Sequence, residues 1–158
     1  MTAARLLALA LFSATLASTG LACASQAPHL VQFVLGEEGA GGVVIAPRRA
    51  AVKASRDQVV INAGQRFEVM LERGHLDLQR EQARIIDAHR LSLQEFEVHS
   101  EDTLVWRLGP VERYQFVYVG SLAGEPFHCR SGDRAFSRAD IEQMLAACRD
   151  VRPVDPDE

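Results

Sequence analysis

The stretch CRSGDRAFSRADIEQMLAAC, from Cys129 to Cys148, decides how the end of this chain folds, because two cysteines bracket the signals of a helix. Ser137 stands where a helix N-cap belongs, and Asp140, three residues later, completes a variant of the capping box. The sequence therefore predicts a helix that begins just after Ser137 and runs to the second cysteine.

One face of this predicted helix is apolar. The intervals i, i+3, i+4 and i+7 bring four residues to the same side, namely Ile141, Met144, Leu145 and Cys148. Phe136 and Ile141 also occupy the two positions of a hydrophobic staple, which fixes how the chain enters a helix. We therefore expect Cys148 to point inward, toward whatever the helix covers.

The N-terminal segment has the pattern of a secretory signal peptide over residues 1–24. One positive charge at Arg5 precedes an apolar run, and small residues follow around Ala22 and Ala24. The apolar run, residues 6–16, is too short to predict a membrane span. We expect an exported bacterial protein, either periplasmic or secreted.

Two cleavage positions fit this leader. Cleavage after Ala24 would remove Cys23 and release a chain without an anchor. Cleavage before Cys23 would make that cysteine the lipid-carrying first residue of an envelope lipoprotein, although Gly20 stands where such signals have a large aliphatic residue. In both cases Cys23 is unavailable to the folded domain.

The two remaining cysteines, Cys129 and Cys148, are predicted to form a disulfide, because paired thiols oxidise in an exported chain. A structural zinc site would need about four ligands, and only His128 lies beside either cysteine. A catalytic Cys–His pair is also disfavoured, since neighbours in an extended segment point to opposite sides and oxidation removes the thiolate. Closing a loop of about twenty residues stabilises a fold by roughly 3 kcal/mol.

Composition indicates one mildly acidic domain. After the leader the chain holds 21 Asp and Glu against 16 Lys and Arg, the total of 17 less Arg5, so its formal charge is −5. This balance lacks the basic surface that attracts nucleic acids or anionic membranes. We expect no nucleic-acid partner, and a membrane contact only through the leader or a lipid on Cys23. The length fits one domain over residues 25–150, followed by a flexible acidic tail, 151–158.

Alternating and aromatic-rich segments predict an α+β fold, with an antiparallel sheet of about five to seven strands and two helices. Phe67, Val69 and Leu71 alternate with polar residues, which is typical of a half-buried strand. Helical periodicity follows, with Asp77 placed as an N-cap. Strands are expected within residues 30–35, 43–46, 57–74, 91–98, 103–108 and 114–119, and the first helix within 77–90.

Two details of this prediction concern the flanks of the sheet. The first helix is expected to turn one side toward the core, formed by Leu78, Gln82, Ile85, Ile86 and His89. Cys129 is placed just beyond the last strand, so that a disulfide would tether the C-terminal helix to the end of the sheet.

Three histidines with nearby carboxylates offer an alternative site, a metal-dependent hydrolase centre. His75, His89 and His99 each lie two residues from an acid, an arrangement that can orient a metal ligand or a general base. If Glu97 and Glu101 share a strand face with His99, that group is the best metal candidate. With 21 carboxylates in the chain, however, a neighbouring acid is expected by chance. A metal centre requires the three imidazoles to converge within about 5 Å.

Aromatic residues in the predicted hairpin of residues 103–119 suggest a third kind of site. Four of them lie at strand spacing, namely Trp106, Tyr114, Phe116 and Tyr118. As an exposed face they would bind a small molecule, which requires a concave apolar pocket beside Trp106. Aromatic residues in strands belong more often to the core.

No nucleophile motif stands out, so the sequence favours a non-catalytic function without a cofactor. We expect an exported envelope or secreted protein that binds another macromolecule, such as an inhibitor, an immunity-type protein or an accessory protein. The alternatives are a periplasmic hydrolase that uses His75, His89 and His99, and a small-molecule binding module with the aromatic hairpin face.

Overall fold

The computed structural model describes residues 28–36, 41–134 and 136–154. The predicted signal peptide, Cys23 and both cleavage positions lie outside the described residues. Neither helix in the described ranges is long and apolar enough to cross a membrane.

Seven antiparallel strands form the main sheet, in the spatial order β3-β4-β5-β9-β8-β7-β6. β3 to β5 make one meander and β6 to β9 make a second, and α1 (Leu78–Ala88) connects them along the chain. β5 pairs with β9, so the two meanders join within the sheet. The elements are β3 (Ala51–Ala54), β4 (Gln58–Asn62), η1 (Gly64–Arg66), β5 (Glu68–Arg73), β6 (Leu93–His99), β7 (Thr103–Leu108), β8 (Arg113–Leu122) and β9 (Glu125–Ser131).

A smaller antiparallel sheet has the order β1-β2-β10. β1 (His29–Val34) pairs with β2 (Gly41–Ala46) over six residues without a register shift. β10 (Arg152–Pro153) pairs with the other edge of β2, and the Val154 N–H donates to the Gly41 carbonyl at 3.2 Å. These contacts correct the expectation of a flexible tail from residue 151, because the chain continues the fold as far as Val154.

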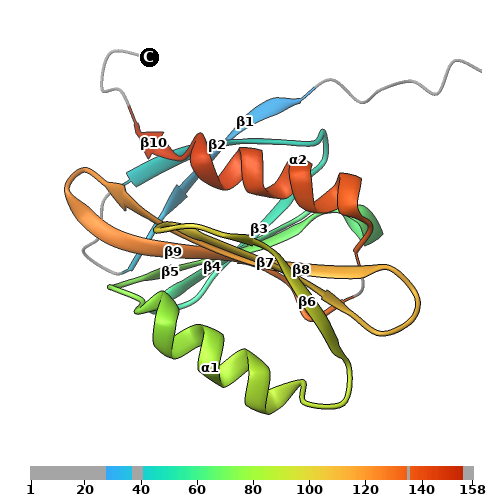
Figure 1. Ribbon diagram of the computed structural model, residues 1–158. Coiled ribbons are helices and arrows are strands. Elements are labelled where there is room, and N and C mark those ends of the chain that lie inside the picture. Colours follow the sequence, from blue (N-terminus) through green and yellow to red (C-terminus); the bar gives the residue numbers. More distant parts are fainter. Residues whose placement is uncertain (1–27, 37–40, 135, 155–158) are drawn as a thin grey trace, which may run out of the picture.

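The layers are visible in Figure 1, where α2 (Arg138–Arg149) lies on one side of the main sheet and α1 on the other. The larger core lies between the main sheet, α2 and the smaller sheet, and it includes Phe33, Val44, Phe116, Ile141 and Met144. A second, smaller core lies under α1 and consists of Leu78, Ile85, Leu104, Trp106 and Val117. The side chains of successive residues in β7 and β8 therefore pack alternately into the larger and the smaller core.

The C-terminal helix has the predicted start and the predicted buried face. Ser137 Oγ accepts from the Asp140 N–H at 3.2 Å, and the Ser137 N–H donates to Asp140 Oδ2 at 3.2 Å. The apolar face is buried, with Ile141, Met144, Leu145 and Cys148 all at most 7% exposed. A disulfide joins Cys148 to Cys129. The α+β fold with a disulfide-tethered C-terminal helix is thus confirmed.

Cys129 lies in the middle of β9 and not beyond the last strand, which corrects the placement made from the sequence. Pro126 is the second residue of β9, next to its start, where the lost N–H is tolerated. Ala123 and Gly124 both have positive φ and form a two-residue turn between β8 and β9. β3 was missed as well, because its short sequence AVKA has no apolar alternation and is exposed throughout.

α1 buries a narrower stripe than the sequence suggests. Its buried residues are Leu78, Glu81 and Ile85. Glu81 is buried, whereas the sequence suggests Gln82 on the buried side. Burial of the Glu81 charge is tolerable because the Arg84 Nε donates to its carboxylate at 2.8 Å. Ile86, expected to face the core, is 48% exposed. Asp77 caps the helix as predicted.

Candidate functional site

The three histidines of the predicted hydrolase centre do not converge. His75 and His99 line one pocket of about 550 Å³ at the N-terminal end of α1. His89 is the C-cap at the other end of this 11-residue helix, which is about 16 Å long. Among the described residues no group of three or more His, Cys, Asp or Glu is placed to hold a metal ion. The hypothesis of a metal centre on these three histidines is therefore wrong.

A β-bulge explains why Glu97 and His99 separate. The register of β6 against β7 shifts between Phe96 and Val98, so the strand alternation breaks there. Glu97 Oε2 lies 3.0 Å from Arg138 Nε of α2. His99 instead lines the pocket beside α1.

The aromatic residues serve two different cores. Trp106 packs under α1, whereas Tyr114 and Phe116 belong to the larger core on the other face of the sheet. Tyr118 is partly buried against the larger core. These side chains do not share one exposed face, although a cavity does lie beside Trp106.

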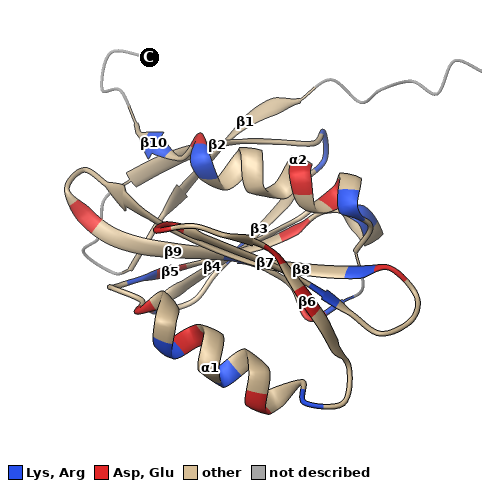
Figure 2. Ribbon diagram, in the orientation of Figure 1, with Lys and Arg blue, Asp and Glu red and all other residues tan. Residues whose placement is uncertain are grey.

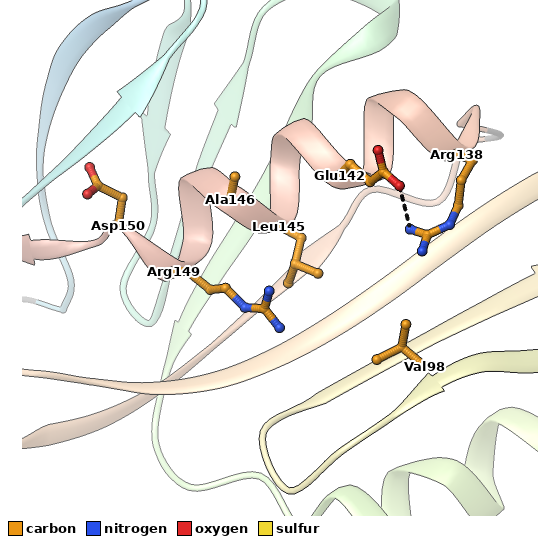
Figure 3. A pocket seen from close by; sticks show the side chains of 7 residues that line it. All are labelled: Val98, Arg138, Glu142, Leu145, Ala146, Arg149 and Asp150. Carbon is orange, nitrogen blue, oxygen red and sulfur yellow. Dashed lines mark ion pairs between the residues drawn. The ribbon is translucent and has the colours of Figure 1, made fainter.

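A groove of about 570 Å³ runs along α2 where the helix faces β6 (Figure 3). Leu145 of α2 and Val98 of β6 point toward one another across it. Arg138 lies 3.6 Å from Glu142 near the start of the helix, and Arg149 lies near its end.

The two arginines of this groove help to hold α2 in place. Arg138 contacts Glu97 of β6, as described above. Arg149 donates to Thr103 Oγ1 at 3.2 Å, and its guanidinium carbon lies 6.0 Å from the centre of the Tyr118 ring. We therefore assign the groove a structural role.

On the face of the main sheet that carries α1, one carboxylate binds three donors from neighbouring strands. Glu72 of β5 accepts from Gln58 Nε2 at 2.7 Å and from Arg130 Nη2 at 2.6 Å, and its other oxygen lies 3.0 Å from His128 Nε2. Burial raises the pKa of Glu72, but these hydrogen bonds and the charge of Arg130 outweigh it and hold the pKa below its ordinary value. We name these four residues the Glu72 cluster.

Between α1 and this face lies a cavity of about 310 Å³, which we name the α1 cavity. Glu81 and Arg84 of α1 line it, and their hydrogen-bonded ion pair lowers the pKa of Glu81. Trp106 of β7 and Arg130 of β9 line it from the sheet. The indole Nε1 of Trp106 and the Nε of Arg130 are buried and have no hydrogen-bond partner in the described part of the chain.

The edge strands of the two sheets differ in how they are protected against pairing. β6 has two register shifts and carries Glu95 and Glu97, β3 is short and carries Lys53, and β10 has two residues. Bulges, charges and shortness are devices that keep an edge from pairing. β1 has six residues, no proline, no bulge and no Asp, Glu, Lys or Arg (Figure 2). No described strand pairs with its outer edge, which carries none of these three devices, although β1 also contacts β3 of the main sheet.

Apolar side chains are exposed on the outer face of the same small sheet. Leu30 of β1 lies opposite Ile45 of β2, and the two are 44% and 40% exposed. Val34 is 53% exposed, and Val154 is 36% exposed beside β2. These four residues are half of the eight large apolar side chains that are exposed in the described ranges. We name them the β1 face.

The disulfide bears on the compartment of the protein. Disulfides persist in non-reducing environments, and the Cys129–Cys148 bond therefore suggests an extracellular or periplasmic location.

Comparisons with protein families, with curated proteins and with solved structures found no match.

Sequence reasoning missed both the α1 cavity and the β1 edge. The signal for the edge was present, because HLVQFV is mostly apolar and contains no Asp, Glu, Lys, Arg or proline. The cavity had no local signal, since Arg84, Trp106 and Arg130 lie on α1, β7 and β9, which only the tertiary fold brings together.

Proposed function

We propose that this protein is an exported, non-catalytic binding protein of the envelope or the secreted fraction, and that it binds another protein at β1. The observation that carries the proposal is the unprotected edge of β1, which adjoins the β1 face. An inhibitor, an immunity-type protein or an accessory protein would each use such a surface.

The edge supports a particular way of binding. An edge strand presents a row of unpaired backbone N–H and C=O groups, to which an extended segment of a partner adds as a further strand. Because β1 contains no Asp, Glu, Lys or Arg, no charged side chain on it would repel or desolvate unfavourably against an incoming strand. The partner that fits it is a protein with an exposed, uncharged strand.

The β1 face supplies selectivity beside the backbone contacts. The side chains of Leu30 and Val34 point to the same face of β1, because side chains along a strand alternate between its two faces. A strand bound at the edge of β1 would therefore lie next to them. A groove of about 400 Å³ adjoins Ile45 and is lined by residues of α2, including Ala146 and Ala147. An apolar side chain of the partner fits this groove.

The compartment is consistent with such a function. The Cys129–Cys148 bond suits an exported domain, and the leader over residues 1–24 is predicted from the sequence. Release after Ala24 or anchoring by a lipid on Cys23 would both leave β1 a few residues from the mature N-terminus. The partner is therefore sought among periplasmic, envelope and secreted proteins.

Site-specific photo-crosslinking in the native cells tests the proposal. A crosslinking residue in place of Gln32, on the outer side of β1, should give one heterologous protein adduct. The same residue in place of Leu91, which is 99% exposed beyond the end of α1, should give none. In the purified complex, hydrogen exchange of the β1 amides should slow, while exchange in β6 stays unchanged.

A second variant shows whether the adduct depends on the β1 face. Val34→Lys adds a charge at an exposed position, so it should keep the melting temperature and remove the adduct at position 32. An adduct that survives Val34→Lys would contradict the proposal. So would equal crosslinking at positions 32 and 91, or an adduct made only of two copies of this chain.

A further inference from the structure

The two helices are attached to the main sheet to very different degrees. α2 buries six residues, and the disulfide and side-chain contacts with η1, β6 and β7 tie it to its neighbours. α1 buries three residues, of which only Leu78 and Ile85 are apolar. Because burial of apolar surface is the main favourable contribution to packing, α1 is the more weakly held helix.

The polar side chains of α1 do not connect the helix to the sheet. Asp77 caps the helix by accepting from the N–H groups of Gln79 and Arg80. Arg84 donates twice to Glu81 of the same helix. In the described part of the chain, no ion pair or side-chain hydrogen bond joins α1 to a strand. The helix therefore depends on apolar contact for its place on the sheet.

The α1 cavity separates part of the helix from the sheet. Charged residues line it from both sides, namely Glu81 and Arg84 from α1 and Arg130 from β9. A space of about 310 Å³ with such polar walls admits water. If the helix moved away, Glu81 and Arg84 would be hydrated, and Arg130 would keep its hydrogen bond to Glu72. Release of α1 would therefore leave no unpaired charge buried.

The main sheet stays connected without α1. β5 pairs with β9 along five residue pairs, so backbone hydrogen bonds join the two meanders. Before the helix, the Gly74 N–H donates to the Pro126 carbonyl at 2.9 Å. After the helix, the Ser92 carbonyl accepts from the Gly109 N–H at 2.6 Å. Both ends of the connection are thus fixed to the sheet, while the helix between them is not.

From these features we propose that α1 is a movable cover, which opens from the main sheet as one unit while both sheets and α2 stay folded. Opening uncovers Leu104, Trp106 and Val117, the buried apolar residues that the sheet contributes to the smaller core. Elements with few buried apolar contacts open at a lower free energy than the whole fold. This opening is independent of the binding of a protein at β1.

Native-state hydrogen exchange of the exported protein tests the proposal. The helical amides from Gln82 to Ala88 should share one protection factor, at least about a hundredfold below that of the amides in the middle of β8 and in α2. Their exchange should also depend less on urea, because opening of α1 exposes less surface than unfolding of the domain. Equal protection in α1 and β8 would overturn the proposal. So would protection that declines gradually toward the helix ends, which indicates fraying.

Two matched substitutions separate the opening of α1 from unfolding of the whole domain. Ile85 of α1 and Ile141 of α2 are 1% and 0% exposed, and valine removes one methylene group from each. Ile141→Val weakens the larger core, which opening of α1 leaves intact. It should therefore lower the protection of the β8 amides several-fold and leave that of the α1 amides unchanged. Ile85→Val removes a contact that is lost in both reactions, so it should lower both protection factors equally. Equal lowering in both elements by Ile141→Val would show that α1 opens only when the domain unfolds.

Thiol labelling shows whether the opening uncovers the sheet. Val117 and Val44 are each 1% exposed, the first under α1 and the second in the larger core. Cysteine behaves as a small apolar residue, so Val117→Cys and Val44→Cys should both fold. In excess maleimide, Val117→Cys should be labelled at least about a hundredfold faster than Val44→Cys. Equal labelling rates would contradict the release of α1 from the sheet.

Discussion

Cys148 in the last turns of α2 and Cys129 in the middle of β9 form a disulfide, with their Cα atoms 6.0 Å apart. Both side chains are buried in the larger core. At the other end of α2, Asp140 bonds to Ser137 and lies 2.9 Å from Arg66 of the η1 turn. The helix is thus fixed to the main sheet covalently near its end and by polar contacts at its start.

Removal of the disulfide should lower the stability of the domain substantially. Cys129→Ser and Cys148→Ser each open a loop with a sequence separation of 19, and chain entropy gives a loss of roughly 3 kcal/mol. For a domain of this size the melting temperature should fall by about 10 °C. Calorimetry should find both single variants similarly destabilised and the double variant no worse than either. A free thiol in the exported native protein would contradict this expectation.

The start of α2 should make the domain sensitive to acid. Burial raises the pKa of Asp140, but hydrogen bonds from Ser137 and Arg66 outweigh it and hold the pKa below its ordinary value. A depressed folded-state pKa contributes stability that is present above the unfolded value of about 3.9 and is lost as the pH falls through the folded value. Asp140→Asn should therefore lower stability at pH 7 and reduce its loss below about pH 4. If the urea midpoints of wild type and variant changed in parallel across this pH range, the carboxylate of Asp140 would not link stability to pH.

Local signals predicted most of the fold correctly. Caps and staples depend on residues a few positions apart, so Asp77 and Ser137 were found from the sequence, and alternation located most strands. β9 was missed because its pairing with β5 and β8, which are distant or separate elements in the sequence, determines it. The contact of Val154 with Gly41 joins the C-terminal end of the described chain to β2, and no local pattern reports such a contact.

The candidate sites were much harder to predict. A His near an acid is a short-range pattern, and the structure separates His75 from His89 by the length of α1 and turns Glu97 away from His99 at a bulge. The α1 cavity depends instead on register. Val117 pairs with Arg130, and Trp106 pairs with Gln115 two positions away along β8. Only the assembled sheet therefore brings the indole and the guanidinium to one cavity.

Loss of the central carboxylate of the Glu72 cluster should be costly. Glu72→Gln leaves Arg130 without its anion and removes an acceptor from His128. Because the Glu72 side chain is 25% exposed, we expect a loss of about 1–2 kcal/mol at pH 7 in urea unfolding. Glu125→Gln breaks the Arg73–Glu125 pair, whose side chains are 44% and 57% exposed, and should cost at most about 0.5 kcal/mol. Equal losses in the two variants would show that the cluster contributes no more than a surface pair.

Two adjacent glycines of β2 should respond very differently to alanine. A Cβ at Gly42 would lie 2.6 Å from the Phe33 ring and 3.1 Å from Leu122 in the larger core. Gly42→Ala should therefore overpack the contact between the two sheets and cost about 1–3 kcal/mol. A Cβ at Gly41 would meet its nearest neighbour, Val154, at an ordinary 3.4 Å, so Gly41→Ala should change stability by less than about 0.5 kcal/mol. Thermal unfolding of both variants measures the difference. A stable Gly42→Ala variant would show that the smaller sheet can move away from the core, which the close packing of Phe33 argues against.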